Sequence, residues 1–156
     1  MKQRRSRGFT LLELLMVMLL LGIVMGMAGF TFARDPQRMA SQEANLFLQL
    51  VQYARQQAVL ERQALGIRID GQGYQLLRAF EDDWVAAGKR RDIGLGLRLR
   101  LEIDGLPVPH ALAGAAPQLL MYGSDEHTPF SLHFEADNVR LVSVSSDGLN
   151  DPQFEY

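Results

Sequence analysis

Hydrophobic positions follow three different patterns along the chain, and each pattern marks one region. Residues 14–33 form an unbroken run of twenty uncharged residues. Residues 37–63 carry apolar side chains at helical spacing, and from residue 65 onward apolar and polar residues alternate. These patterns predict a helix of bilayer length, an amphipathic helix and half-buried strands, in that order. The sequence therefore predicts an α+β fold in which a long helical N-terminal part precedes an antiparallel sheet.

The uncharged run has an unusual N-terminal border. At about 1.5 Å per residue it is roughly 30 Å long, the thickness of the hydrocarbon core of a bilayer. A basic leader precedes it, with Lys2, Arg4, Arg5 and Arg7. Such a leader keeps the N-terminus cytoplasmic and sends the rest of the chain across the membrane. The run is longer than the apolar core of an ordinary secretory signal peptide.

One acidic residue, Glu13, directly precedes this run and lies one turn inside the wider apolar segment, since Phe9, Leu11 and Leu12 come before it. A plain signal anchor explains the hydropathy and the basic leader, but it gives no reason for a carboxylate. Such a group costs about 2.5–3.5 kcal/mol at the centre of a membrane helix and less near the interface. A cationic partner at the same depth would remove that cost, so Glu13 is the first candidate for a functional residue.

A second helix is predicted after residue 34. Asp35 is a good N-cap and Pro36 suits a first helical turn, although a kink within one long helix is the close alternative. A stripe of apolar residues follows at helical spacing: Ala40, Ala44, Phe47, Val51, Ala54 and Ala58, widened by Leu46, Leu50 and Tyr53. Most charged and amide residues, Arg55 among them, fall off the stripe. This pattern is typical of a helix packed on a sheet, with a partner-binding face as the alternative.

The remaining chain predicts strands. Ile67 and Ile69 alternate with polar residues before the turn at residues 71–73, which indicates a hairpin. Residues 81–96 suggest a loop or a short irregular strand, and Leu95 opens an alternating, half-buried strand that runs to Ile103. After a proline-rich loop at 107–117, we expect three more strands at 119–122, 130–135 and 139–145, with a turn at 136–138. Residues 146–156 are expected to form a polar, acidic tail.

Candidate catalytic or metal-binding groups are sparse. The chain has no cysteine, and its three histidines lack the spacing of a helical metal pair. We expect His133 to be a solvated strand residue, and adjacent Asp82 and Asp83 to point to opposite faces. Oxygen ligands of the kind Ca²⁺ prefers do occur in the tail, without the spacing of an EF-hand: Asp147, Asn150, Asp151 and Glu155. The sequence thus predicts no enzyme, no cofactor and no metal site, with calcium in the tail as the open alternative.

Charge is distributed unevenly. The first eight residues carry four basic groups and no acid, whereas the rest carries twelve basic and eighteen acidic groups. From Leu101 onward one basic residue, Arg140, stands against nine acidic residues. An acidic surface of this kind repels phosphates, so nucleic acid is not an expected partner.

The segment Gly8-Phe9-Thr10-Leu11-Leu12-Glu13, with its basic leader and apolar helix, resembles the class III signal of type IV pilins and type II secretion pseudopilins. The resemblance implies cleavage by prepilin peptidase between Gly8 and Phe9 and methylation of the new N-terminus. It also implies that Glu13 guides assembly. The implied organisation is a leader at 1–8, a transmembrane helix at 9–33, an amphipathic helix at 34–64 and a β-rich head at 65–156. Together these parts make the pilin fold.

A second, weaker resemblance lies near the C-terminus. The segments 121–132, 139–144 and 146–148 are similar to the C-terminal region of H-type minor pseudopilins, although Met121–Asp125 departs from the usual lead-in. This implies a structural minor subunit of the type II secretion pseudopilus, in its tip complex, with the anchor in the inner membrane and the head in the periplasm. The implied partners are other minor pseudopilins, the major pseudopilin, the inner-membrane secretion platform, prepilin peptidase and membrane lipid. A minor pilin of a type IV pilus or of a DNA-uptake system is the alternative.

Overall fold

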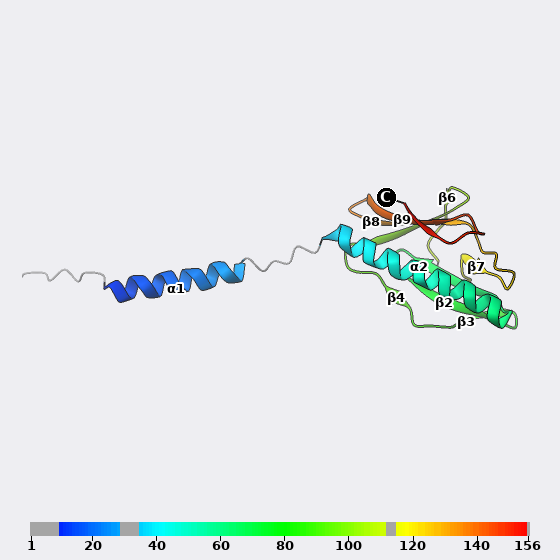
Figure 1. Ribbon diagram of the computed structural model, residues 1–156, viewed down its shortest axis with the longest axis horizontal. Coiled ribbons are helices and arrows are strands. Elements are labelled where there is room, and N and C mark those ends of the chain that lie inside the picture. Colours follow the sequence, from blue (N-terminus) through cyan, green and yellow to red (C-terminus); the bar gives the residue numbers. More distant parts are fainter. Residues whose placement is uncertain (1–9, 29–34, 112–114, 156) are drawn as a thin grey trace, which may run out of the picture. The chain divides into compact units, whose positions relative to one another are not determined.

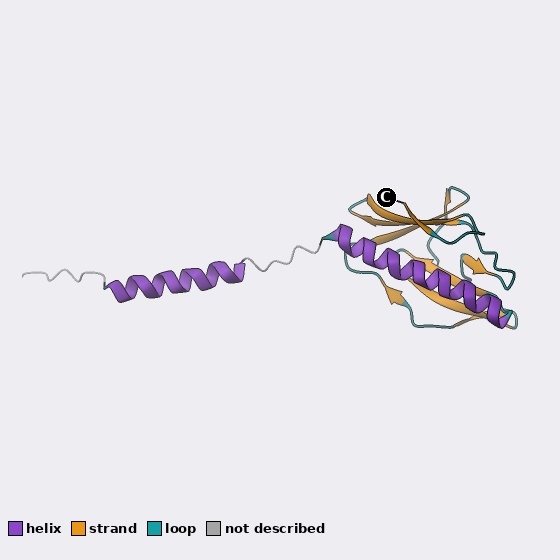
Figure 2. Ribbon diagram, viewed as in Figure 1, coloured by secondary structure: helices purple, strands orange, loops and turns teal. Residues whose placement is uncertain are grey.

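The computed structural model describes residues 10–28, 35–111 and 115–155, which fall into two units, residues 1–34 and 35–156 (Figure 1). The described part of the first unit contains one helix, α1 (Leu11–Ala28). The second unit contains helix α2 (Pro36–Glu61) and all the described strands (Figure 2). Gly8, Phe9 and the segment between the helices, residues 29–34, lie outside the described residues.

Helix α2 begins where the sequence predicts. The Asp35 side chain accepts a hydrogen bond from the Gln37 backbone N–H at 3.1 Å, and Pro36 is the first helical residue. Asp35 has an extended backbone (φ −69°, ψ 107°), so the helical conformation of α2 starts directly after it, at Pro36. The helix ends at Arg62, whose left-handed conformation (φ 51°) lets its N–H donate to the carbonyl of Ala58.

The strands form two sheets where the sequence predicted one. The first sheet has the order β3-β2-β1-β7, with β4 also paired to β2, and the second has the order β10-β9-β8-β5-β6. The first comprises β1 (Leu65–Asp70), β2 (Gly73–Phe80), β3 (Asp83–Ala86), β4 (Arg91–Asp92) and β7 (Leu119–Met121). The second comprises β5 (Arg98–Ile103), β6 (Leu106–Pro107), β8 (Phe130–Ala136), β9 (Val139–Ser146) and β10 (Gln153–Glu155). All pairings are antiparallel, as expected.

The core lies where α2 packs on both sheets (Figure 1). All six residues of the predicted stripe are fully buried, which confirms the helical period. At the centre, the Phe47 ring makes edge-on contacts with Tyr74 of the first sheet (5.1 Å between centroids) and with Phe130 of the second (5.9 Å). One aromatic side chain of α2 therefore joins the two sheets.

Some predicted positions were wrong. Leu95 is exposed, because a turn closed by the Leu97 N–H and the Gly94 carbonyl (3.1 Å) interrupts the alternation before β5 begins. Leu46 and Tyr53 do not widen the buried stripe; both are exposed, whereas Leu50 is partly buried. The tail is not wholly irregular either, since β10 pairs with β9 through residues 143–145.

The predicted hairpin turns are confirmed. Residues Gly71 and Gln72 join β1 to β2, and the Asp70 side chain accepts a hydrogen bond from the Gln72 N–H at 2.9 Å. Asp137 and Asn138 join β8 to β9, both with positive φ (49° and 63°). Aspartate and asparagine tolerate this conformation better than most residues, which is why this pair suits a tight hairpin.

Candidate functional site

Glu13 lies in the first turn of α1 with its side chain exposed. Its backbone N–H donates to the carbonyl of Thr10 at 3.0 Å and lies 3.4 Å from the Thr10 hydroxyl oxygen. Thr10-Leu11-Leu12-Glu13 fits the spacing of a capping box, in which the first side chain accepts from the N–H three residues on. The predicted assembly role of Glu13 does not include this local role, although the spacing of Thr10 and Glu13 is its signal in the sequence.

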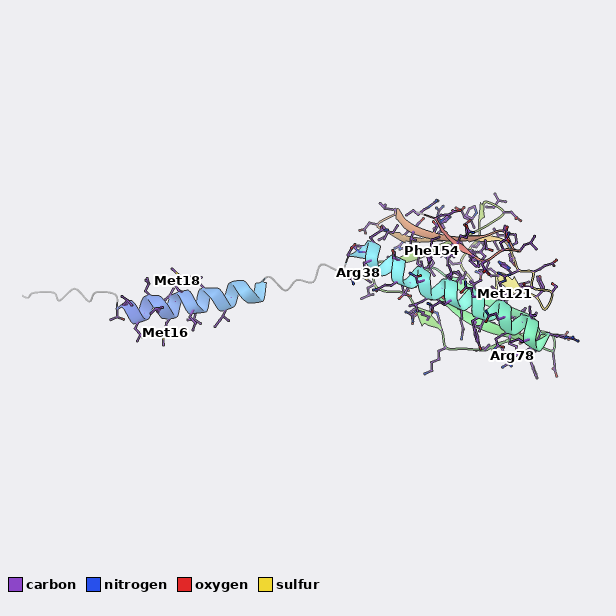
Figure 3. The ribbon with its side chains drawn as sticks, in the orientation of Figure 1. Met16, Met18, Arg38, Arg78, Met121 and Phe154 are labelled. Atoms are coloured by element: carbon purple, nitrogen blue, oxygen red, sulfur yellow. The ribbon has the colours of Figure 1, made fainter. Side chains whose placement is uncertain are left out.

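Apart from Glu13, helix α1 is apolar on every side. The side chains from Leu11 to Val24 are exposed, and Met16 and Met18 project from opposite sides of the helix (Figure 3). A helix that is hydrophobic all round lacks the polar face of an ordinary surface helix. None of the helices in the part of the chain that is described combines the length and apolarity needed to cross a membrane.

A buried arginine makes four hydrogen bonds within the second unit. Arg55 of α2 is only 7% exposed. Its Nη1 donates to Asp151 Oδ1 (2.9 Å) and to the Asn150 carbonyl (3.2 Å), and its Nη2 donates to Asp125 Oδ1 (3.2 Å) and to the Leu149 carbonyl (3.1 Å). We call these five residues the Arg55 cluster. It connects α2 to two loops far along the chain, one after β7 and one after β9.

The helical pattern predicts only that Arg55 falls off the buried stripe. The pattern does not reveal the Arg55 cluster, because helical periodicity does not show which side of the helix a later loop will cover. A signal was nevertheless present: Arg55 is the only charged residue among the seventeen residues at 44–60.

The C-terminal loop is held by its own hydrogen bonds. Asp147 accepts from the N–H groups of Asn150 (2.8 Å) and Leu149 (3.0 Å) and from the Asn150 side-chain amide (2.7 Å). The hydrogen bonds from these two backbone groups and the amide lower the pKa of Asp147 to about 2. The neighbouring Asp151 binds Arg55, and Glu155 accepts from the Ser145 hydroxyl at 2.8 Å. The acidic residues considered for calcium thus each have an internal role.

A metal centre has no support among the described residues, because no group of three or more His, Asp or Glu residues there could hold an ion. Asp82 and Asp83 are both exposed. Only Asp83 belongs to a strand, and its side chain accepts from the Trp84 N–H at 2.7 Å.

Two histidines are buried, which overturns the expectation of a solvated His133. His133 of β8 is 3% exposed, its Nδ1 lies 2.7 Å from the Ser143 hydroxyl, and its Nε2 lies 3.4 Å from Glu102 Oε2. Burial lowers its pKa, although the nearby Glu102 carboxylate opposes the shift. Ser143 is also fully buried, so this row of serine, histidine and glutamate is closed to a substrate.

His127 belongs to the C-terminal loop region. Its Nε2 lies 2.7 Å from the Ser146 hydroxyl, and its backbone N–H donates to the Gly148 carbonyl at 2.9 Å. Burial, and secondarily the charge of Arg55, lower the pKa of His127. Gly148 has a positive φ of 89°, and a Cβ there would lie 2.6 Å from the His127 carbonyl. The residues of segment 146–148 therefore have identifiable structural roles. Asp147 accepts the N–H groups of the loop, and Gly148 allows the backbone to lie close to the His127 carbonyl.

Solved structures of similar fold identify the fold of the protein. The minor pseudopilin EpsH of the type II secretion system of Vibrio cholerae matches with a TM-score of 0.65 at 21% identity, over 74% of this chain and 94% of that one. The solution structure of Escherichia coli GspH matches with a TM-score of 0.64 at 17% identity, over 81% and 94% of the two chains. At these identities the likeness establishes the pilin fold, with the helix packed on antiparallel sheets.

Sequence comparison gives the family. Residues 3–31 match the prokaryotic N-terminal methylation motif, and residues 43–148, more than half of the chain, match the type II transport protein GspH family. Type II secretion system protein H of Pseudomonas aeruginosa is 32% identical over 97% of both chains, and that of Aeromonas hydrophila is 33% identical over 94% of this chain and 92% of its own. The chain belongs to the GspH family of type II secretion pseudopilins.

Proposed function

We propose that this chain is a structural minor subunit of the type II secretion pseudopilus and that it acts in the tip complex of the fibre. Family membership supports the pseudopilin role, and the N-terminal motif supports anchoring of the subunit in a membrane. In this proposal the basic leader stays cytoplasmic, residues 9–33 form a single span of the inner membrane, and the head from Asp35 onward lies in the periplasm. The role is one of assembly, with no chemical reaction.

Processing creates the charge that Glu13 needs. Prepilin peptidase cuts between Gly8 and Phe9, and the methylated amine of Phe9 then lies four residues from Glu13, one helical turn away. Neither charge is well solvated within a membrane, so the Phe9 amine of one subunit and the Glu13 carboxylate of a neighbour neutralise each other at one stagger of adjacent helices. The observation that carries this proposal is the position of Glu13, an exposed lone acid at the start of the otherwise apolar α1.

The partners follow from this role. The secretion platform of the inner membrane and membrane lipid surround the stored subunit, and prepilin peptidase processes it. Other minor pseudopilins and the major pseudopilin contact it in the assembled fibre. The fibre supports export of folded proteins across the outer membrane.

The Glu13→Gln variant tests the charge separately from the helix cap. Glutamine keeps the length and the capping ability of glutamate, because both residues serve at the third position of a capping box, but it carries no charge. We expect the variant to be cleaved and to accumulate in the inner membrane, yet to be absent from isolated pseudopili. Secretion should fall to the level of a strain that lacks this chain.

The Thr10→Ser variant is the matched control, since serine keeps the cap and leaves Glu13 unchanged. Normal entry of Glu13→Gln into pseudopili would show that the charge does not set the stagger. Normal secretion in a strain without this chain would overturn the proposed function itself.

A further inference from the structure

The outward sides of α2 carry almost no charge over most of its length. Between Glu43 and Glu61 the single charged residue is Arg55, and the Arg55 cluster holds its guanidinium inside the head. What remains exposed over residues 44–60 is apolar or amide. Exposed helix faces in globular proteins usually carry charged residues, so this surface is better suited to contact with another protein than to water.

One flank of this uncharged region has the spacing of a helix-packing seam. Leu46, Leu50, Tyr53, Gln57 and Leu60 follow one another at intervals of four, three, four and three residues. We call these five residues the α2 seam. They lie beside the buried stripe and not within it: Leu46 is 38%, Tyr53 51% and Leu60 78% exposed. Alternating intervals of three and four residues bring side chains to one line along a helix, which is the arrangement that packs against a second helix.

Three residues of the seam line a groove. Leu46, Leu50 and Tyr53 line a cavity of about 690 Å³ together with Tyr74 and Leu76 of β2 and with residues 87–92, which we call the wall of the groove. The wall is fixed to β2, because the Ala87 N–H donates to the Leu76 carbonyl at 3.0 Å and the Gln75 amide donates to the Gly88 carbonyl at 3.1 Å.

The arginines of the wall are already neutralised. Arg90 forms an ion pair with Asp70 at 2.8 Å, and Arg91 donates to both oxygens of Glu43 at 2.9 and 3.0 Å. Neither of these two arginines therefore offers an unpaired charge to a ligand, and Lys89 is the remaining basic residue that lines the groove.

We propose that the α2 seam and its groove are the docking surface for an amphipathic helix of a neighbouring pseudopilus subunit. The inference rests on the proposed function, which supplies such neighbours. The matching helix is about four turns long, as is the stretch from Leu46 to Leu60, and presents apolar or amide side chains at the same spacing. A charged side chain on the contact side of the partner helix would lose its hydration and would meet no opposite charge among the five seam residues. Within the seam the Gln57 amide donates to the Tyr53 hydroxyl at 3.2 Å, a polar pair that fixes the register between the helices.

The absence of cysteine from the natural chain makes a direct test possible. Leu46→Cys and Tyr53→Cys place one thiol on the seam, whereas Asn45→Cys and Gln56→Cys place it on exposed positions of the same helix off the seam. Each full-length variant is expressed in secreting cells, labelled in membranes with a thiol-reactive benzophenone and irradiated. The adducts are then identified by peptide mass spectrometry.

We expect the two seam variants to give adducts with the helical segment of another pseudopilin, at several times the yield of the two control variants. Equal yields from seam and control positions would overturn the proposal, as would the lack of a pseudopilin adduct. Adducts with lipid would indicate a membrane-facing helix, and adducts with a second copy of this chain would indicate self-association. If either kind of adduct is the main product, the docking proposal is overturned.

Charge substitution separates this inference from the proposed function. Leu46→Glu and Tyr53→Glu should each reduce co-isolation with other pseudopilins at least tenfold. The control Asn45→Glu should leave co-isolation unchanged. Thermal melting of the purified full chain shows whether each variant folds. If all three variants fold, co-isolate and secrete like wild type, the docking surface is wrong and the pseudopilin role stands. If the unmodified chain neither co-isolates with pseudopilins nor supports secretion, the proposed function fails first.

Discussion

At the scale of single residues, some positions with strict local requirements lie in the C-terminal loop and on the second sheet. Gly148 has a backbone that other residues rarely adopt, and it lies against the His127 carbonyl. His133 and Ser143 make a hydrogen-bonded pair that is almost completely buried. Neither requirement comes from chemistry on a substrate. Both come from the close packing of chain segments that are distant in sequence.

Replacing Gly148 by alanine should destabilise the head. The positive φ alone costs about 1–2 kcal/mol for a residue with a Cβ, and the 2.6 Å approach to the His127 carbonyl adds to that cost. The matched control is Gly105→Ala, which has a similar φ of 74° but open space around the new Cβ. Thermal melting of both full-length variants measures the difference. Equal losses would show that the loop moves to relieve the contact.

Acid should weaken the fold through its buried histidines. Burial lowers the pKa of both His127 and His133 below the usual value of about 6.5. Below pH 6.5 the unfolded chain therefore binds more protons than the folded chain. The free energy of unfolding should fall as the pH is lowered through this range, by up to about 1.4 kcal/mol per pH unit for each histidine.

Denaturation of the full chain in detergent between pH 5 and 8 measures this slope. His133→Asn should make the slope shallower, because one of the buried titrating groups is gone. His110→Asn is the control, since His110 is exposed, and it should leave the slope unchanged. A stability that does not change with pH in wild type would contradict the assignment.

At the scale of elements, α2 organises the second unit through three of its sides. The alanine-rich stripe packs on the sheets, the Arg55 cluster holds the loops after β7 and β9, and the α2 seam remains exposed beside β2. Edge strand β10 has only three residues, so its position depends on the loop that Arg55 holds. The helix is therefore both the core element and the anchor of the C-terminus.

Arg55→Met should release the C-terminal segment without unfolding the head. Methionine fills much of the same space but cannot donate to the four oxygens that Arg55 binds. Each hydrogen bond to a charged group contributes at most about 1.5–3 kcal/mol to stability. The partners Asp125 and Asp151 are largely exposed, so the net loss should be about 1–3 kcal/mol.

Amide hydrogen exchange of the full chain tests this effect locally. Residues 147–155 should exchange faster in Arg55→Met, while the β1–β2 hairpin keeps its protection. Arg55→Lys is the informative second variant, because a lysine has no planar fork and cannot bind both aspartates in the same way. Uniformly faster exchange across the head would show that Arg55 supports the whole core and not this segment.

At the scale of the whole molecule, charge separates the basic leader from an acidic remainder. The nine acidic residues after Leu101 include members of the Arg55 cluster, the C-terminal loop and the outer strands, against the single basic residue Arg140. This distribution suits a chain whose leader stays cytoplasmic and whose head meets other proteins. It argues against the alternative of a DNA-uptake pilin.

The full chain in detergent should not bind double-stranded DNA. With one cation among its last 56 residues, the distal half offers no basic patch that would release counter-ions from phosphates. A gel-shift titration at low salt, where electrostatic binding is strongest, is the sensitive test, with a basic DNA-binding protein as the positive control. Binding that weakens steeply with added salt would favour the DNA-uptake alternative.

Features that depend on neighbouring residues could be predicted from the amino-acid pattern. Helical spacing identified six of the seven buried residues of α2, Asp35 and Pro36 marked its start, and alternation located most strands. The short motif around Glu13 pointed to the family that the comparisons show. Local patterns suffice here, because capping, period and turn chemistry act within a few residues.

The division into two sheets, the burial of Arg55 and His133, and the exposure of most of the α2 seam are visible only in the folded chain. These features depend on which distant segment covers which side of an element. Arg55 is buried because the loops at 122–126 and 147–151 close over it, and His133 is buried because Ser143 and Glu102 flank it on the adjacent strands. The seam of α2 is instead exposed, since the sheets pack against the stripe next to it.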